Sequence, residues 1–203
     1  ARRLVDAAAL CGVDAVKLQT YQADTVASKK AIFDMENTGV VSQHELFRKF
    51  EIARSLHKEV FAYAGLKGLD WFSTPSHESD VDFLEECGVG AHKIGSDDAV
   101  NVPFLRYVAR TGKPIILSTG MCTMNEVHRS VGAILGEGND RLILLHAITS
   151  YPTHPEDVNL SAMHSMMREF PGLTIGYSDH TLDPVACLCA AAMGARVLER
   201  HFT

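Results

Sequence analysis

Short runs of apolar and β-branched residues recur along the chain, and each run is followed by a polar residue and then by a helix-like pattern. Runs of this length, bounded by turn residues, predict buried β-strands. After the first gap they recur at intervals of about 20–30 residues, the spacing of a strand plus a crossover helix. The predicted strands cover residues 15–20, 69–74, 91–96, 114–119, 142–148, 173–178 and 195–201.

The segments between these runs show helical spacing and helix-end signals. Residues 42–66 repeat apolar side chains at positions that share one face of a helix. Thr123 followed by Glu126 predicts a capping box, and Asn101 and Asp183 each stand just before a proline at the start of a helical pattern. The predicted helices cover residues 42–66, 79–87, 102–111, 124–135, 159–170 and 184–193, and residues 4–10 are also amphipathic.

Alternating strands and helices predict a parallel sheet, either open and doubly wound or closed as a (β/α)₈ TIM barrel. The phosphate-binding fingerprints GxGxxG and GxxxxGK[ST], common in open sheets, do not occur in the sequence. Polar residues follow nearly every predicted strand, which favours the α/β barrel. Because a barrel has eight strands, we expect an incomplete TIM barrel that lacks the first strand, ahead of Ala1, and the C-terminal end of the eighth unit.

Composition excludes several classes of protein. The chain is 46% hydrophobic and 22% charged, as in an ordinary globular enzyme. Its net charge is -6 and its lysines and arginines form no cluster, so we expect no nucleic-acid partner. No run of about 18 apolar residues predicts a membrane span. The five cysteines lack metal-type CxxC spacing and predict free thiols in a reducing, cytoplasmic compartment.

Polar side chains collect at the C-terminal ends of the predicted strands, which converge on one mouth in a barrel. Lys17 and Lys93 alternate with apolar neighbours, so their ammonium groups are expected to point inward and to need an anion. Three interpretations are open: a carboxylate partner in the barrel floor, an anionic phosphate or carboxylate substrate, and a Schiff-base lysine as in barrel aldolases. Hydroxyl groups at other strand ends would supply further donors, namely Thr74, Ser96, Ser118 and Ser178.

Two histidines lie at or just past the ends of consecutive predicted strands, His180 and His201. Neutral imidazoles from adjacent strands, with few other protein ligands, suit an open divalent-metal site. His146 lies inside an apolar run, which favours a hydrogen-bonded core histidine instead.

Seven segments carry a family resemblance: VKLQTYQADT, FSTPS, HKIGSDD, GKPIILSTGM, SYPTHPEDVNL, IGYSDHT and VLERHFT. In this order they resemble the N-acetylneuraminate (sialic acid) synthase family, which includes the legionaminic and pseudaminic acid synthases. The resemblance implies a transferase that condenses phosphoenolpyruvate, water and an open-chain N-acyl amino sugar, typically N-acetylmannosamine, to N-acetylneuraminate and phosphate. It also implies a partial TIM-barrel catalytic domain over residues 1–203.

The resemblance further implies roles for single residues. His180 and His201 would hold a divalent ion, Mn²⁺ or Mg²⁺. The catalytic residues would be Lys17, Lys93 and Asp98, both lysines also binding phosphoenolpyruvate. The other phosphoenolpyruvate contacts would be Thr74, Ser96, Ser118, Thr149 and Ser178. The amino-sugar contacts would be Gln19, Asp98 and Tyr151, with Asn37 as a weaker candidate in a loop, residues 27–37, that is shorter than in the family.

The family pattern also includes parts that this sequence does not contain. In the full-length protein the resemblance implies a first-strand glutamate that would act as general base, a C-terminal antifreeze-like (SAF) domain and a homodimer. The same chemistry on a diacetamido-trideoxyhexose, giving legionaminate or pseudaminate, is the nearest alternative. A Schiff-base lysine aldolase and a non-catalytic barrel that binds a sugar or phosphate are the others.

Overall fold

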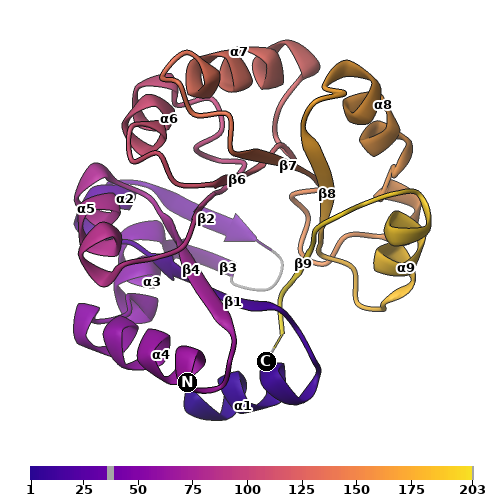
Figure 1. Ribbon diagram of the computed structural model, residues 1–203. Helices are drawn as coiled ribbons and strands as arrows, with labels where there is room; N and C mark the ends of the chain where they lie inside the picture. Colours follow the sequence, from indigo (N-terminus) through magenta and orange to yellow (C-terminus); the bar gives the residue numbers. More distant parts are fainter. Residues whose placement is uncertain (36–38, 203) are drawn as a thin grey trace. The chain divides into compact units, whose positions relative to one another are not determined.

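The computed structural model describes residues 1–35 and 39–202, and the chain divides into two compact units, Ala1–Gly90 and Ala91–Thr203. Asn37, the weaker sugar-contact candidate, lies outside the described residues. The second unit alternates strands with helices, as the hydrophobic pattern predicts, and the first unit does so except for a β-hairpin and two successive helices (Figure 1).

The first unit is built on two parallel strands. β1 pairs with β4 from Ala15 opposite Asp70 to Thr20 opposite Pro75. Helices α1 and α4 pack against the pair through a buried apolar cluster that includes Val5, Val60 and Leu69. The elements are α1 (Arg2–Leu10), β1 (Ala15–Thr20), α2 (Ala23–Val26), β2 (Ile32–Met35), β3 (Gly39–Ser42), α3 (Gln43–Phe50), α4 (Arg54–Leu66), β4 (Asp70–Pro75) and α5 (Glu78–Cys87).

The second unit is a parallel sheet in which each strand pairs with the next strand along the chain, from β5 to β9. Helices α6 to α9 lie outside the strands that they connect (Figure 1). The elements are β5 (His92–Ile94), α6 (Val102–Ala109), β6 (Ile115–Ser118), α7 (Met124–Leu135), β7 (Leu142–Ala147), the 3₁₀ helix η1 (Pro155–Asp157), α8 (Ser161–Glu169), β8 (Thr174–Asp179), α9 (Val185–Ala192) and β9 (Leu198–Arg200).

The predicted helix starts in this unit are confirmed. Thr123 and Glu126 form a reciprocal capping box at α7, and the Asn101 side chain accepts from the Phe104 amide at α6. Asp183 Oδ1 accepts from the Val185 amide, 2.9 Å away, at α9. These side chains satisfy amide groups that the first helical turn leaves without a partner, so each helix begins at a defined residue.

β8 and β9 approach each other closely at a glycine. A β-carbon at Gly176 would lie 2.7 Å from Leu145 Cδ2 and 2.9 Å from Val197 Cβ. Any side chain at this position would therefore push the neighbouring strands apart. Since His180 follows β8 and His201 follows β9, the glycine helps to keep the two histidine-bearing strand ends together.

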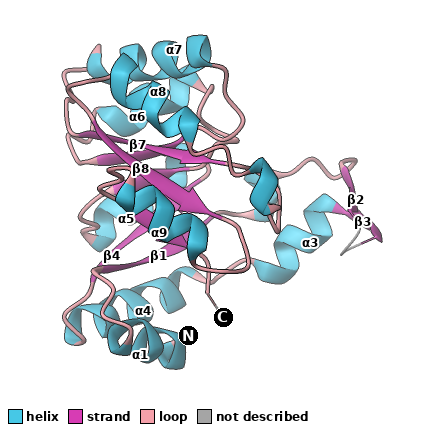
Figure 2. Ribbon diagram, turned by 90° about the vertical axis from the view of Figure 1, so that its right-hand side faces the viewer, coloured by secondary structure: helices cyan, strands magenta, loops and turns pink. Residues whose placement is uncertain are grey.

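Two predictions in the first unit are wrong. The single helix over residues 42–66 is two helices, α3 and α4, separated at residues 51–53. Glu51, which lies in this break, bonds to a distant part of the chain: its Oε2 accepts from the Ala23 amide at 2.8 Å. The loop expected over residues 27–37 instead contributes to an antiparallel hairpin, β2–β3. Phe33 of this hairpin packs against Phe47 of α3, and Figure 2 shows the hairpin and α3 standing apart from α1 and α4.

Candidate functional site

Lys93 is the most deeply buried cation of the candidate site. Lys93 lies on β5 and is 2% exposed. Its ammonium group donates to Ser118 Oγ of β6 at 2.7 Å and to the Ile94 carbonyl at 2.8 Å. The same nitrogen lies 3.8 Å from Glu199 Oε1 on β9. A buried ammonium needs this kind of compensation, because desolvation disfavours an isolated charge strongly.

Glu199 is a site residue to which the sequence patterns assigned no role. Its Oε1 accepts from Ser178 Oγ of β8 at 2.8 Å. Lys93, Ser118, Ser178 and Glu199 therefore form one connected polar group, the lysine cluster, drawn from four strands. The available signal is its place near the end of a predicted strand, two residues before the candidate metal ligand His201.

Ser96 and Thr149 meet around Gly120, just past β6. Ser96 is 8% exposed, and its Oγ accepts from the Gly120 amide at 2.9 Å. Thr149 Oγ1 donates to the Gly120 carbonyl at 3.3 Å. The loops that follow β5, β6 and β7 are thus tied together, so both predicted substrate contacts have fixed positions.

His180 and His201 lie side by side with their ring centroids 5.3 Å apart. The ring of Tyr151 lies 4.1 Å from the His180 centroid and 5.9 Å from that of His201. His180 Nδ1 is 2.6 Å from the Ile148 carbonyl oxygen, which can only accept, so Nδ1 carries the proton and Nε2 keeps its lone pair. This is the tautomer and orientation that a metal-ligating imidazole adopts.

The described residues contain no group of three or more histidine, cysteine or carboxylate side chains arranged to hold a metal ion. Two imidazoles from adjacent strand ends would therefore leave most coordination positions to water or to substrate oxygens. Such an open set fits a catalytic divalent ion better than a closed structural site. The residues present fit the metal that the family resemblance implies.

Asp98 lies half-buried after β5, beside another carboxylate. Burial and the charge of Asp97 raise the pKa of Asp98 from its usual 3.8 to about 6, although a hydrogen bond from Asn101 opposes the shift. Asp98 can therefore change protonation state close to neutral pH, as a residue that handles protons needs to.

The raised pKa of Asp98 predicts a pH-dependent stability. An acid whose pKa is higher in the folded than in the unfolded protein stabilises the fold below its unfolded pKa, and this contribution disappears as the pH rises through the folded value. We expect Asp98→Asn to leave the melting temperature nearly unchanged at pH 4 and to raise it relative to wild type at pH 7, where the wild-type side chain is charged. Melting curves at four pH values across this interval provide the measurement.

The neighbouring aspartate supplies the control. Asp97→Asn removes the like charge and should lower the pKa of Asp98, so the stability change should move to lower pH. A melting-temperature difference between Asp98→Asn and wild type that stays constant from pH 4 to pH 7 would show that Asp98 is not perturbed in this way.

The first unit presents three predicted site residues on one face of its strand pair. Gln19 stands opposite Thr74 in the β1–β4 register, and Lys17 lies two residues before Gln19. Side chains two residues apart on a strand point to the same side. Gln19 is exposed, whereas Lys17 and Thr74 are half-buried.

The other face of this strand pair is locked by hydrogen bonds. Thr20 Oγ1 and Ser73 Oγ lie 2.7 Å apart, and both residues are buried. His57, 1% exposed on α4, places Nε2 3.2 Å from the Gln19 carbonyl oxygen. These bonds hold the end of β1 from behind and so fix the backbone that carries Lys17 and Gln19.

His146 is a core histidine, as its apolar run predicts. It is 6% exposed, its Nε2 lies 2.9 Å from the Val158 carbonyl, and burial lowers its pKa. A neutral, hydrogen-bonded imidazole in this position has a structural role.

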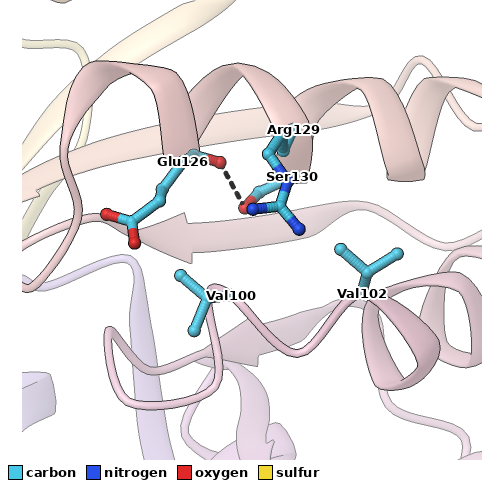
Figure 3. Close-up of a pocket in the computed structure, with 5 residues that line it drawn as sticks. All are labelled: Val100, Val102, Glu126, Arg129 and Ser130. Carbon is cyan, nitrogen blue, oxygen red and sulfur yellow. Dashed lines mark hydrogen bonds between the residues drawn. The ribbon is translucent and has the colours of Figure 1, made fainter.

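A small depression lies between α7 and the start of α6 (Figure 3). Ser130 lines it, with Oγ 2.6 Å from the Ala99 carbonyl and 2.8 Å from the Glu126 carbonyl. Its hydroxyl is therefore committed to backbone groups, and none of the predicted site residues takes part. The lining residues are Val100, Val102, Glu126, Arg129 and Ser130.

Comparison with known proteins places this strand-end chemistry in a family. The sequence matches the NeuB family over residues 4–203. The chain belongs to the NeuB family. It is 40% identical over 211 residues to the N,N'-diacetyllegionaminic acid synthase of Legionella pneumophila, covering 100% of this chain and 59% of the relative. It is 35% identical over 207 residues to the pseudaminic acid synthase of Campylobacter jejuni, covering 100% of this chain and 60% of the relative. The NeuB-family chain thus spans less than two thirds of the length of these relatives.

Solved structures confirm the predicted fold class, an α/β structure of the TIM-barrel type. The N-acetylneuraminic acid synthetase of Leptospira borgpetersenii matches all of this NeuB-family chain with a TM-score of 0.88 at 29% identity, and 67% of that protein is covered. A 3-deoxy-D-arabino-heptulosonate 7-phosphate synthase of Thermotoga maritima matches with a TM-score of 0.73 at 18% identity, which indicates a shared fold alone. Within residues 1–35 and 39–202, no helix is long and apolar enough to cross a membrane.

Proposed function

We propose that this chain is the condensing part of a sugar-acid synthase that joins phosphoenolpyruvate, water and an open-chain N-acyl amino sugar, with N-acetylmannosamine as the expected sugar. The products would be N-acetylneuraminate and inorganic phosphate. The observation that carries the proposal is the buried lysine cluster, because an interior ammonium surrounded by hydroxyl groups suits the carboxylate or phosphate of an anionic substrate. Family membership supports the same reaction class.

In this proposal the chain's own groups bind and orient the two substrates. Lys93, Ser118 and Ser178 would bind phosphoenolpyruvate together with Ser96 and Thr149, and the family resemblance assigns Lys17 and Thr74 to the same substrate. Gln19, Asp98 and Tyr151 would contact the sugar. Holding both substrates in one orientation lowers the activation barrier of the condensation, because a bimolecular encounter becomes an effectively unimolecular step.

The reaction needs both electrophilic and basic assistance. His180 and His201 would hold Mn²⁺ or Mg²⁺, which when bound supplies Lewis-acid polarisation of the sugar aldehyde. Carbon 3 of phosphoenolpyruvate attacks that aldehyde, positive charge develops at carbon 2, water adds there, and phosphate leaves. Glu199 lies in the lysine cluster as a carboxylate that can stabilise the developing charge, and Asp98 is poised to accept a proton from the water.

The full-length protein is proposed to be a cytoplasmic transferase that forms a homodimer and carries an antifreeze-like (SAF) domain after the barrel. Its partners would be small-molecule substrates, with no nucleic acid or membrane involved. A first-strand glutamate would serve there as a further general base.

Phosphate release tests this function directly. Full-length protein is mixed with Mn²⁺, phosphoenolpyruvate and either N-acetylmannosamine or a 2,4-diacetamido-trideoxyhexose, and phosphate and the sugar acid are quantified together. We expect equimolar release of both products with one sugar class. Absence of phosphate release with every amino sugar would overturn the proposal.

Three alternatives can be tested with the same protein preparation. The 40% identity to a diacetyllegionaminic acid synthase favours a diacetamido sugar as the second candidate substrate. A Schiff-base aldolase needs a lysine nitrogen that attacks a carbonyl carbon, whereas Lys93 Nζ donates to Ser118 Oγ and lies 3.8 Å from Glu199 Oε1. Borohydride trapping of a pyruvate adduct on Lys93 or Lys17 would support the aldolase, and Mn²⁺ binding without turnover would support a non-catalytic barrel.

A further inference from the structure

Asp179 is a fully buried carboxylate that immediately precedes His180 on β8. Its side chain is 0% exposed. Oδ1 accepts from the Thr181 amide at 2.9 Å and from the Tyr177 hydroxyl at 3.1 Å. Oδ2 accepts from Thr181 Oγ1 at 3.1 Å and from Cys187 Sγ at 3.3 Å. No step of the proposed reaction uses this group, yet four donors converge on it.

Arg200 completes this arrangement from the neighbouring strand. The β8–β9 register places Arg200 opposite Asp179, and its Nη1 lies 3.3 Å from Asp179 Oδ2. The same guanidinium donates to the Asp183 carbonyl at 2.7 Å and to the Thr181 carbonyl at 2.9 Å. Arg200 therefore contacts both the end of β8 and the turn that follows His180.

The two metal-ligand candidates are the next residues along each strand. His180 stands between Asp179 and Thr181, whose positions are both fixed by these bonds, and His201 directly follows Arg200. The Arg200 guanidinium thus contacts the residues on both sides of His180, Asp179 and Thr181. The Arg200 backbone continues directly into His201. This connection joins the two backbone segments that carry the imidazoles.

We propose that Asp179 and Arg200 are positioning residues that set the separation of His180 and His201 and thereby the affinity for a divalent ion. The inference rests on the metal role assigned to the histidines in the proposed function. Neither side chain needs to touch the ion, because each acts through the backbone of a ligand. Groups that orient metal ligands in this way commonly contribute about 10–100-fold to metal affinity.

Simple electrostatics makes a different prediction, which allows a discriminating test. If only charge mattered, Asp179→Asn would leave a positive Arg200 near the ion and weaken binding, whereas Arg200→Gln would leave a negative Asp179 and strengthen it. If positioning matters, both substitutions weaken binding. The direction of the Arg200→Gln effect therefore separates the two explanations.

The experiment measures Mn²⁺ binding to the full-length protein by electron paramagnetic resonance, without phosphoenolpyruvate or sugar. We expect Asp179→Asn and Arg200→Gln each to raise the Mn²⁺ dissociation constant by about 10–100-fold. Arg110→Gln removes an exposed arginine whose Nε lies 2.9 Å from Glu137 Oε2 and should leave the constant unchanged. Melting curves without metal establish the folded fraction of each variant. If Asp179→Asn fails to fold, the Mn²⁺ dissociation constant of Arg200→Lys is measured in its place.

The outcomes are distinguishable from those of the proposed function. Unchanged Mn²⁺ affinity in folded Asp179→Asn and Arg200→Gln, or tighter binding by Arg200→Gln, overturns the positioning role while leaving the metal site intact. A wild-type protein that binds no Mn²⁺ overturns the metal assignment itself. Product formation is recorded separately, so neither result depends on turnover.

Discussion

Replacing Lys93 by methionine in the full-length protein is expected to lower kcat/KM for phosphoenolpyruvate by about 10²–10³-fold, the loss typical of removing one preorganised donor from an anion site. Methionine keeps the length and apolar stem of the side chain but removes the ammonium group that contacts Ser118. No other described contact replaces the donation to Ser118 Oγ in that variant. Steady-state phosphate release at varied phosphoenolpyruvate concentration is the measurement.

Stability must be separated from activity in this variant. Lys93→Met removes the ammonium group that lies 3.8 Å from Glu199 Oε1, and breaking a buried pair in this way costs about 3–5 kcal/mol of folding stability, less where one partner is partly exposed. The double variant Lys93→Met with Glu199→Gln removes both charges and should recover the melting temperature without recovering activity. Lys29→Met, at an exposed position, serves as the matched control. Activity of Lys93→Met within about threefold of wild type would remove Lys93 from the anion site.

Replacing His180 by alanine is expected to abolish tight Mn²⁺ binding and to lower turnover by about 10³-fold, since electrophilic assistance by a metal contributes several kcal/mol to such reactions. The imidazole is held by the Ile148 carbonyl, 2.6 Å from Nδ1, and alanine removes the ring that would ligate the ion. Calorimetric Mn²⁺ titration and phosphate release are the two measurements. Wild-type activity should disappear with a chelator and return with Mn²⁺ or Mg²⁺.

A second histidine provides the control for that substitution. His164 is an exposed residue of α8 whose Nε2 lies 3.2 Å from the Met193 carbonyl. His164→Ala should bind Mn²⁺ and turn over as wild type does. Equal Mn²⁺ affinity in His180→Ala and wild type would show that His180 is not a ligand.

The regular part of the fold could be predicted because its signals are local. Thr123 and Glu126 are three residues apart, and each strand run carries its own apolar signature. The break between α3 and α4 could not be predicted in this way. It is stabilised by a hydrogen bond from the Ala23 amide to Glu51, 28 residues away in the sequence. The apolar spacing of residues 42–66 continues across the break, so periodicity alone indicates one helix.

The candidate site shows the same division between local and non-local information. Lys93 could be singled out because an ammonium between apolar neighbours conflicts with burial. Glu199 could not be singled out, since its role depends on two partners distant in sequence: Ser178, its register partner on β8, and Lys93 on β5. Family resemblance names ligands and contacts, whereas the groups that orient them, such as Asp179, become visible only through the hydrogen bonds they accept.

The connection from β1 to β4 can change in length at little cost in free energy. It carries α2, the β2–β3 hairpin and α3 before α4 begins, and it leaves β1 directly after Gln19 and Thr20. Doubling the length of such an excursion costs only about 0.6 kcal/mol in closure entropy, while the β1–β4 register stays intact. We therefore expect this connection to tolerate insertions and deletions more readily than β1 or β4 does.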